Sequence, residues 1–167
     1  MLLGAVIIMD AFNIKEAIAG NYSGSGRGLY PTIQPFEYDE IVKFTLSPKG
    51  FLHYVQATFS VIDRSPMHSE CGYMRIFPDL KVEFLVSQPT GISEIAQGVA
   101  VVKESGIIEL ELDSTISYTS SAKRVTRSIR RFCFDTWGMR YEMDMATEDV
   151  DLTLHLSAVL SRGGKET

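Results

Sequence analysis

Cysteine is scarce in this sequence. Only Cys71 and Cys133 occur, far apart and without a CxxC pair. Structural zinc sites and disulfide-rich scaffolds need closely spaced cysteines, so neither class is favoured. We expect reduced thiols and a cytoplasmic location, with a single disulfide as the alternative.

An excess of positive charge is also lacking. The chain has 16 Lys and Arg against 21 Asp and Glu, which gives a formal net charge of -5. Proteins that bind nucleic acid generally present a basic surface to the phosphates. We therefore expect no nucleic-acid partner.

Long hydrophobic runs are missing as well. The opening stretch MLLGAVIIM (residues 1–9) has no basic flank, and it is far shorter than the roughly 18 apolar residues that span a bilayer. We expect no membrane partner and interpret residues 1–12 as a tail, with Met9 as an alternative start. The size of the chain, 167 residues, fits one compact domain, which we place at residues 13–163 and follow with a C-terminal tail at 164–167.

Common catalytic and phosphate-binding motifs are absent. No serine lies in a GxSxG sequence, and no carboxylate pair stands out as acid and base, so hydrolase chemistry has no support. The glycine-rich segment after residue 20 has Leu29 where a dinucleotide fingerprint needs glycine, and no Gly-Lys-Ser/Thr follows. Phosphate binding there is disfavoured.

Alternation of apolar and polar residues dominates what is present. It runs through residues 81–87, 139–145 and 151–160 and is typical of half-buried β-strands. Turn sequences separate the runs at 47–50, 63–66, 77–79, 89–91, 104–106 and 136–138. The pattern predicts nine or ten strands, which favours a closed antiparallel barrel that can hold one small ligand. A β-sandwich is the rival fold.

A short amphipathic segment, DAFNIKEAIAG, precedes the strands. Asp10 is a suitable N-cap and Gly20 a suitable terminator, so the segment predicts a short N-terminal helix.

Three glycines at every second position follow this helix. Gly24, Gly26 and Gly28 share one phase with Tyr22 and Tyr30. Side chains alternate between the two faces of a strand, so this spacing leaves one face bare. A flat or bulky group can approach such a face closely.

Only three histidines are available for imidazole chemistry, and His155 is the most interesting. It lies in LTLHLSAVL, where alternation groups it with Thr153 and Ser157 and opposes it to the leucines. Two interpretations follow: a half-exposed histidine on the outer face of a sheet, or a ligand for a metal or cofactor.

The other two histidines carry weaker signals. His68 lies near Glu70 and Cys71 in PMHSECGY, but zinc sites draw their ligands from more than one segment. A polar turn is the favoured interpretation. His53 is interpreted as a strand surface residue.

A basic run lies in the second half of the chain. It consists of Lys123, Arg124, Arg127, Arg130 and Arg131. We favour a solvated strand face for this run; binding of an anion such as a cofactor carboxylate, or a local contact with nucleic acid, is the alternative.

The segment GNYSGSGRGLYPTI resembles the signature of the nitrobindin family, in which Gly-x-Trp-x-Gly-x-Gly runs into Tyr-Pro-Thr-Ile. Tyr22 replaces the tryptophan. Further similar segments follow in family order: QPFEYDE (34–40), FLHYVQ (51–56), PMHSECGYMRI (66–76), PTGISEIAQG (89–98), SAK (121–123) and HLSAVL (155–160). The resemblance covers residues 14–162 and is strongest to the nitrobindin-like domain that ends an animal THAP zinc-finger protein.

This resemblance implies a ten-stranded antiparallel β-barrel, similar to fatty-acid-binding proteins, that holds haem b at its open end. His155 then corresponds to the axial iron ligand and the residue through which catalysis runs. Thr32 and Lys123 correspond to haem contacts, and the face of Gly24, Gly26 and Gly28 makes room for the ring.

The resemblance also implies an activity. Nitrobindins hold ferric iron, bind nitric oxide and isomerise peroxynitrite to nitrate, with the cofactor breaking the bond while the barrel keeps the fragments together. A non-enzymatic carrier of a small apolar ligand and an interaction module with a vestigial cavity are the alternatives. Dimerisation of the barrel and a nuclear location stay open.

Overall fold

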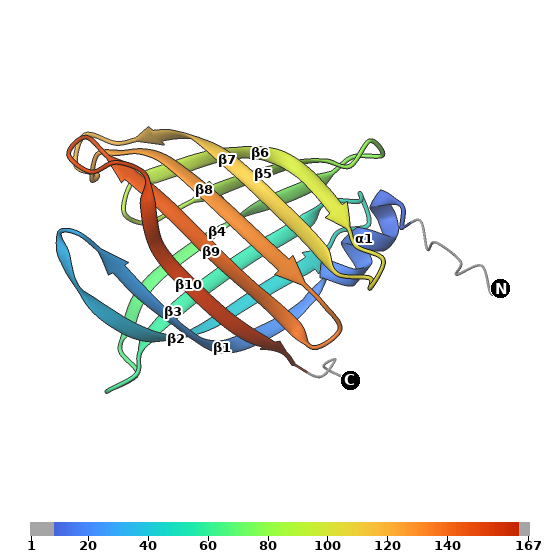
Figure 1. Ribbon diagram of the computed structural model, residues 1–167, viewed down its shortest axis with the longest axis horizontal. Helices are drawn as coiled ribbons and strands as arrows, with labels where there is room; N and C mark the ends of the chain where they lie inside the picture. The colour runs from blue at the N-terminus through green and yellow to red at the C-terminus, as the bar shows by residue number, and fades with distance from the viewer. Residues whose placement is uncertain (1–8, 164–167) are drawn as a thin grey trace.

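Ten antiparallel strands form a closed barrel in the computed structural model, which describes residues 9–163 (Figure 1). The elements are α1 (Ala11–Ile18), β1 (Gly20–Tyr30), β2 (Ile33–Leu46), β3 (Leu52–Ser60), β4 (Pro66–Ile76), β5 (Lys81–Ser87), β6 (Ile92–Val102), β7 (Ile108–Tyr118), β8 (Val125–Phe134), β9 (Gly138–Thr147) and β10 (Thr153–Arg162). Each strand pairs with its neighbour in sequence, and β1 closes the barrel against β10. The fold confirms the predicted barrel and excludes the sandwich, because all ten strands belong to one closed sheet.

Helix α1 lies against one end of this barrel (Figure 1). Asp10 Oδ1 accepts hydrogen bonds from the backbone N–H groups of Phe12 and Asn13, at 3.0 and 2.9 Å, and so caps the helix as expected. Ile14 and Ile18 have no exposed surface and belong to the barrel core. The helix therefore closes this end.

The helix ends one residue earlier than the sequence indicated. Its C-cap is Ala19, while Gly20 is already the first residue of β1. Helix α1 also begins at Ala11, within the segment expected as a tail. The remainder of that tail, residues 1–8, and the C-terminal tail 164–167 lie outside the described residues.

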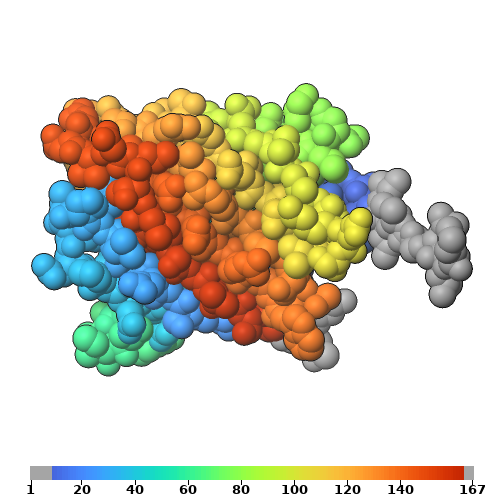
Figure 2. Space-filling model, in the orientation of Figure 1, coloured from blue at the N-terminus to red at the C-terminus, as the bar shows by residue number. Residues whose placement is uncertain are grey.

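Aromatic side chains fill the half of the barrel next to α1. Tyr22, Phe44, Phe84 and Phe134 are at most 2% exposed, and neighbouring rings meet edge to face. Aromatic pairs of this geometry add to the stabilisation that burial itself gives. In the space-filling view the strands form continuous diagonal bands, with β10 directly beside β9 (Figure 2).

Irregular pairing occurs at the other end. The strand register shifts between Gly28 and Tyr30, Thr58 and Phe59, Val125 and Arg127, and Leu154 and Leu156. Each shift lies near the strand end remote from α1. Bulges of this kind occur at barrel rims and turn side chains in new directions.

Among residues 9–163, no helix is long and apolar enough to cross a bilayer.

Candidate functional site

A cavity of about 330 Å³ opens at the barrel end opposite α1. This volume lies within the range of small-molecule sites. Its apolar lining consists mainly of Ile33, Phe36, Met67, Ile92, Val125, Met143, Met145 and Leu156. Polar side chains converge at its mouth and, more deeply, at its floor.

His155 reaches this cavity because of a bulge in β10. Thr153 pairs with Met145 and Leu156 pairs with Met143, so β10 holds one residue more than β9 over this stretch. The extra residue lets His155 and its neighbour Leu156 both line the cavity. Strict alternation places His155 on the outer face with Ser157. That interpretation is wrong, because the bulge in β10 directs His155 to the cavity.

The imidazole of His155 is held at its Nδ1 side. Nδ1 lies 3.1 Å from the carbonyl oxygen of Leu29, and Tyr30 meets the ring edge to face at a centroid distance of 5.2 Å. Burial lowers the pKa of His155, while the bond to Leu29 opposes that shift. A neutral ring that donates Nδ1–H to Leu29 keeps its lone pair on Nε2. This is the form in which histidine binds metals.

Two basic side chains lie at the mouth. Lys123 and His68 both line the cavity, and positive charge on either of them adds to the lowering of the His155 pKa. Lys123 is exposed, so it can meet a carboxylate of a ligand at the cavity entrance. His68 faces Glu70 with Nε2 and Oε2 3.7 Å apart. The polar turn expected around His68 is wrong, because this segment belongs to β4 and pairs with β3.

The glycines of β1 lie behind side chains that line the cavity. A Cβ atom on Gly28 would meet the Phe36 ring at 2.1 Å, and one on Gly26 would meet the Tyr38 ring at 2.4 Å. Both rings line the cavity. The bare face is therefore covered by two aromatic side chains of β2, whereas a Cβ on Gly24 would strike the backbone of β10.

Thr32 lies in the turn between β1 and β2 and is exposed. The adjacent Ile33 lines the cavity, but Thr32 itself does not. The structure thus brings His155 and Lys123 together at one cavity and leaves Thr32 at its rim.

A buried polar network that was not predicted from the sequence lies on the cavity floor. Arg130 is 4% exposed; its Nη1 lies 2.7 Å from Glu70 Oε1, and its Nη2 lies 2.7 Å from Glu94 Oε1. The solvated face expected for the basic run is wrong for Arg130, although it holds for Arg127. The missed signal was the phase of β8, because Arg130 alternates in step with the buried Phe132.

Tyrosine and serine hydroxyls complete this network. Tyr54 donates to Glu70 at 2.7 Å, while Ser114 and Ser128 donate to Glu94 at 3.2 and 2.8 Å. Burial alone would raise the pKa of Glu70, but the Arg130 charge and the hydrogen bonds hold it well below its usual range. Glu70 is therefore ionised at neutral pH.

A second carboxylate centre lies nearby. Glu40 accepts from Gln56 Nε2 at 2.9 Å and from the hydroxyl of Tyr141, whose nearest contact is also 2.9 Å. Burial raises the pKa of Glu40 to about 7, against the effect of these hydrogen bonds. Gln56 Oε1 is buried and has no hydrogen-bond partner within the described part of the chain.

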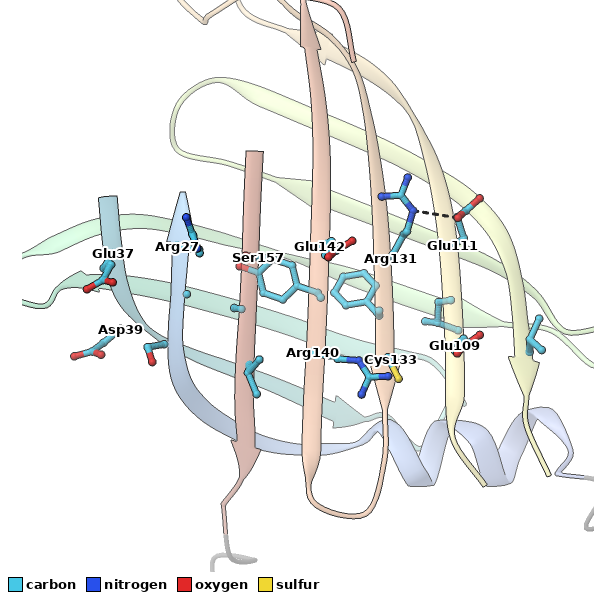
Figure 3. Close-up of a pocket in the computed structure, with 18 of the residues that line it drawn as sticks. Arg27, Glu37, Asp39, Glu109, Glu111, Arg131, Cys133, Arg140, Glu142 and Ser157 are labelled. Carbon is cyan, nitrogen blue, oxygen red and sulfur yellow. Dashed lines mark hydrogen bonds and ion pairs between the residues drawn. The ribbon is translucent and has the colours of Figure 1, made fainter. Parts of the chain in front are cut away.

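A larger hollow of about 820 Å³ lies outside the barrel wall. Figure 3 shows its labelled side chains, among them Arg27, Glu37, Arg131 and Glu111, spread over several neighbouring strands. Arg131 bonds to Glu111 at 3.2 Å there. Acidic and basic side chains are mixed on this outer surface, and some of them form ion pairs of the kind common on exposed strands. We therefore take the interior cavity as the candidate site.

The fold and the cavity together define a ligand-binding antiparallel barrel with one neutral histidine available as a metal ligand. The model of a family described as "THAP4-like, heme-binding beta-barrel domain" matches residues 15–162. The chain belongs to this family, the nitrobindins, which confirms the resemblance seen in the sequence.

Individual relatives agree. The chain is 41% identical over 159 residues to peroxynitrite isomerase 1 of Mycobacterium tuberculosis H37Rv, covering 93% of this chain and 96% of the relative. It is 40% identical over 146 residues to peroxynitrite isomerase 1 of Mycolicibacterium paratuberculosis, covering 87% and 90%. The crystal structure of Rv2717c from M. tuberculosis matches with a TM-score of 0.88 at 39% identity, over 92% of this chain and 98% of that one.

The residues of the cavity fit the haem that the family binds. An imidazole with a free Nε2, apolar and aromatic walls, and basic side chains at the mouth suit the iron, the ring and the carboxylates of haem respectively. Cys71 and Cys133 do not line the cavity, so the fit is to haem held without thioether bonds.

Proposed function

We propose that this protein holds haem b with His155 Nε2 as the axial ligand and, in that form, isomerises peroxynitrite to nitrate. The observation that carries the proposal is the imidazole of His155, which lines the cavity with its Nδ1 already bonded to Leu29. The names of the mycobacterial relatives, about 40% identical over most of the chain, support the reaction.

The chain's own residues have distinct parts in this proposal. Bound haem supplies the iron at which the peroxide bond is broken. His155 orients the cofactor, because its ring is fixed by Leu29 and Tyr30. Lys123 at the mouth offers its ammonium group to a haem carboxylate, and the exposed hydroxyl of Thr32 offers a hydrogen bond to the edge of the ring.

The walls of the cavity contribute confinement. Gly24, Gly26 and Gly28 let β10 and the rings of Tyr38 and Phe36 lie close to β1, which sets the shape of that wall. The closed strand wall and the helix at the far end keep the reacting groups together, so that recombination to nitrate competes with escape.

Nitric oxide is the second ligand that we propose. It is small and uncharged, and its binding to iron depends little on a hydrogen-bond donor. The thioether and aliphatic side chains of Met67, Met143 and Leu156 provide an apolar surrounding of the kind that governs access to haem iron.

Haemin titration tests the proposal. We expect the wild type to develop a sharp Soret band with an end point at one equivalent, and His155→Ala to lose that band or shift it strongly. His53→Ala is the matched control, because His53 is exposed on β3, and it should titrate like the wild type. An unchanged Soret band in His155→Ala would refute the axial assignment.

Rapid mixing with peroxynitrite tests the reaction. The haem-loaded wild type should accelerate peroxynitrite decay and raise the yield of nitrate over nitrite. If haem binds but neither the decay rate nor the nitrate yield changes, the catalytic part of the proposal fails. Purification with a bound lipid and no haemin end point would instead support the carrier.

A further inference from the structure

We infer that the floor of the cavity selects porphyrins whose metal-containing core is positively charged, such as trivalent metalloporphyrins, over neutral porphyrins of the same shape. The inference rests on the proposed haem site and deepens it, because it concerns the charge of the ligand that the cavity favours.

The floor of the cavity holds more carboxylates than guanidinium groups. Glu70, Glu94 and Arg130 are each at most 6% exposed and line the same cavity as His155. Two carboxylates therefore share one guanidinium. Arg130 donates four hydrogen bonds to these carboxylates, two to each, at 2.7 to 3.1 Å.

Neutral hydrogen-bond donors surround both carboxylates. Tyr54 donates to Glu70, and Ser114, Ser128 and Gln88 donate to Glu94, at 2.7 to 3.2 Å. Donors of this kind bring no positive charge of their own. The floor thus holds two carboxylates and a single guanidinium group.

Two other groups that can carry positive charge lie nearby. Lys123 is exposed at the mouth, so solvent screens its charge. His68 is half-buried and faces Glu70, with Nε2 3.7 Å from Oε2, and it offsets the charge of Glu70 only when its imidazole is protonated. Glu40 adds further negative charge when it ionises. Gln56 also lines the cavity, and its buried Oε1, which has no hydrogen-bond partner among residues 9–163, carries the negative end of the amide dipole. The interior therefore attracts positive charge.

A buried, uncompensated charge is costly in a medium of low dielectric constant. A ligand with a positive core in the same cavity offsets this cost. A porphyrin with a trivalent metal carries one positive charge in its core, whereas a porphyrin with a divalent metal has a neutral core with the same outline and the same carboxylates. At an effective dielectric constant of about 20, the interaction of two unit charges roughly 12 Å apart corresponds to about a tenfold change in affinity.

The experiment compares Ga(III)- and Zn(II)-protoporphyrin IX, titrated by fluorescence into the full chain. The measured quantity is the ratio of their dissociation constants in each variant relative to the wild type, because intrinsic preferences cancel in that comparison. Glu94→Gln removes one negative charge and should lower the preference for Ga(III) about tenfold.

Gln88 offers a matched pair of variants that leaves the ion pairs of Arg130 intact. Gln88 Nε2 lies 2.9 Å from Glu94 Oε1, so Gln88→Lys places a positive charge beside Glu94 and should also lower the Ga(III) preference. Gln88→Met has a similar length and no charge, and it should keep the wild-type ratio. Denaturation midpoints verify that each variant is folded.

The outcomes are distinct. Binding of both porphyrins with an unchanged ratio in Gln88→Lys overturns the inference and leaves the haem site standing. An equal loss of the Ga(III) preference in Gln88→Met and Gln88→Lys also overturns the inference, because the preference then depends on the shape of the side chain and not on its charge. Failure of wild-type protein to bind haemin at His155 is a different result, and it refutes the proposed function itself.

Discussion

Nδ1 of His155 and the carbonyl oxygen of Leu29 lie 3.1 Å apart, although 126 residues separate them in the chain. The contact joins β10 to the end of β1 across the seam that closes the barrel. The most important side chain of the site is therefore oriented only once the first and last strands have paired.

Tyr30 should control how firmly His155 is held. Its ring contacts the imidazole edge to face, and its hydroxyl donates to the carbonyl of Met145 at 3.2 Å. Such an aromatic contact is worth roughly 0.5–1.5 kcal/mol, so Tyr30→Ala should weaken haemin binding about three- to tenfold. Tyr30→Phe keeps the ring and should bind nearly as well as the wild type. Transfer of haem to apomyoglobin measures the difference, and equal affinity in both variants would contradict this role.

Gly28 should not tolerate a methyl group. In Gly28→Ala the new Cβ would overlap the Phe36 ring, and overpacking of this kind costs roughly 1–3 kcal/mol. Urea denaturation should detect the loss. Ser25→Ala, at an exposed position of the same strand, should have little effect. Adding Phe36→Leu to Gly28→Ala should restore part of the stability; a purely additive double variant would show that Phe36 is not the obstacle.

Two adjacent arginines should differ sharply in their contribution to stability. Arg130 points inward to Glu70 and Glu94, while Arg131 points outward to Glu111 and Asp144. Arg130→Met leaves two buried carboxylates unpaired and should cost about 3–5 kcal/mol. Arg131→Met breaks one exposed and one partly buried pair at the barrel surface and should cost about 1 kcal/mol or less. Chemical denaturation of both variants provides the comparison, and similar losses would contradict the inward placement of Arg130.

Glu40 should make the protein less stable as pH rises. Its pKa increases from 4.5 to about 7 on folding because of burial, so the folded state binds more protons than the unfolded state between these values. The associated stabilisation is complete below pH 4.5, is lost progressively as pH rises to about 7, and is on the order of 3 kcal/mol.

Glu40→Gln is the control for this prediction. The amide cannot ionise, so the variant should lack this part of the decline when free energies of unfolding are measured from pH 4.5 to 8. Subtracting the two profiles removes the contribution of His155, which has the opposite sign because its pKa is lowered on folding. Parallel profiles would contradict the protonation of Glu40.

Much of the fold could be read from the sequence. The predicted turns at 47–50, 89–91 and 104–106 all separate strands in the structure, because the glycine in each of them adopts the positive φ that tight turns require. The helix before β1 was also predictable, because its N-cap, Asp10, bonds to the backbone only two and three residues further along the chain. Turns and helix caps depend on residues that are adjacent in the chain, so a single sequence is enough to predict them.

The site was readable only in part. The burial of Arg130 could have been inferred from its phase with Phe132, but the partners that make burial tolerable, Glu70 and Glu94, lie on β4 and β6. The direction of His155 was assigned by resemblance and not by pattern, because alternation placed it on the outer face. Nothing in the residues around Leu154 marks the bulge.

The sequence by itself determined the alternating strands and the turns between them, and its ordered motifs identified the family and, through it, the ten-stranded barrel. Only the tertiary structure decided that His155 lines the cavity, that two aromatic rings cover the glycines, and that one arginine serves two carboxylates. The physical reason is that side-chain direction in a sheet depends on strand register. Register is a property of two strands together, and a bulge in one strand exists only relative to its partner.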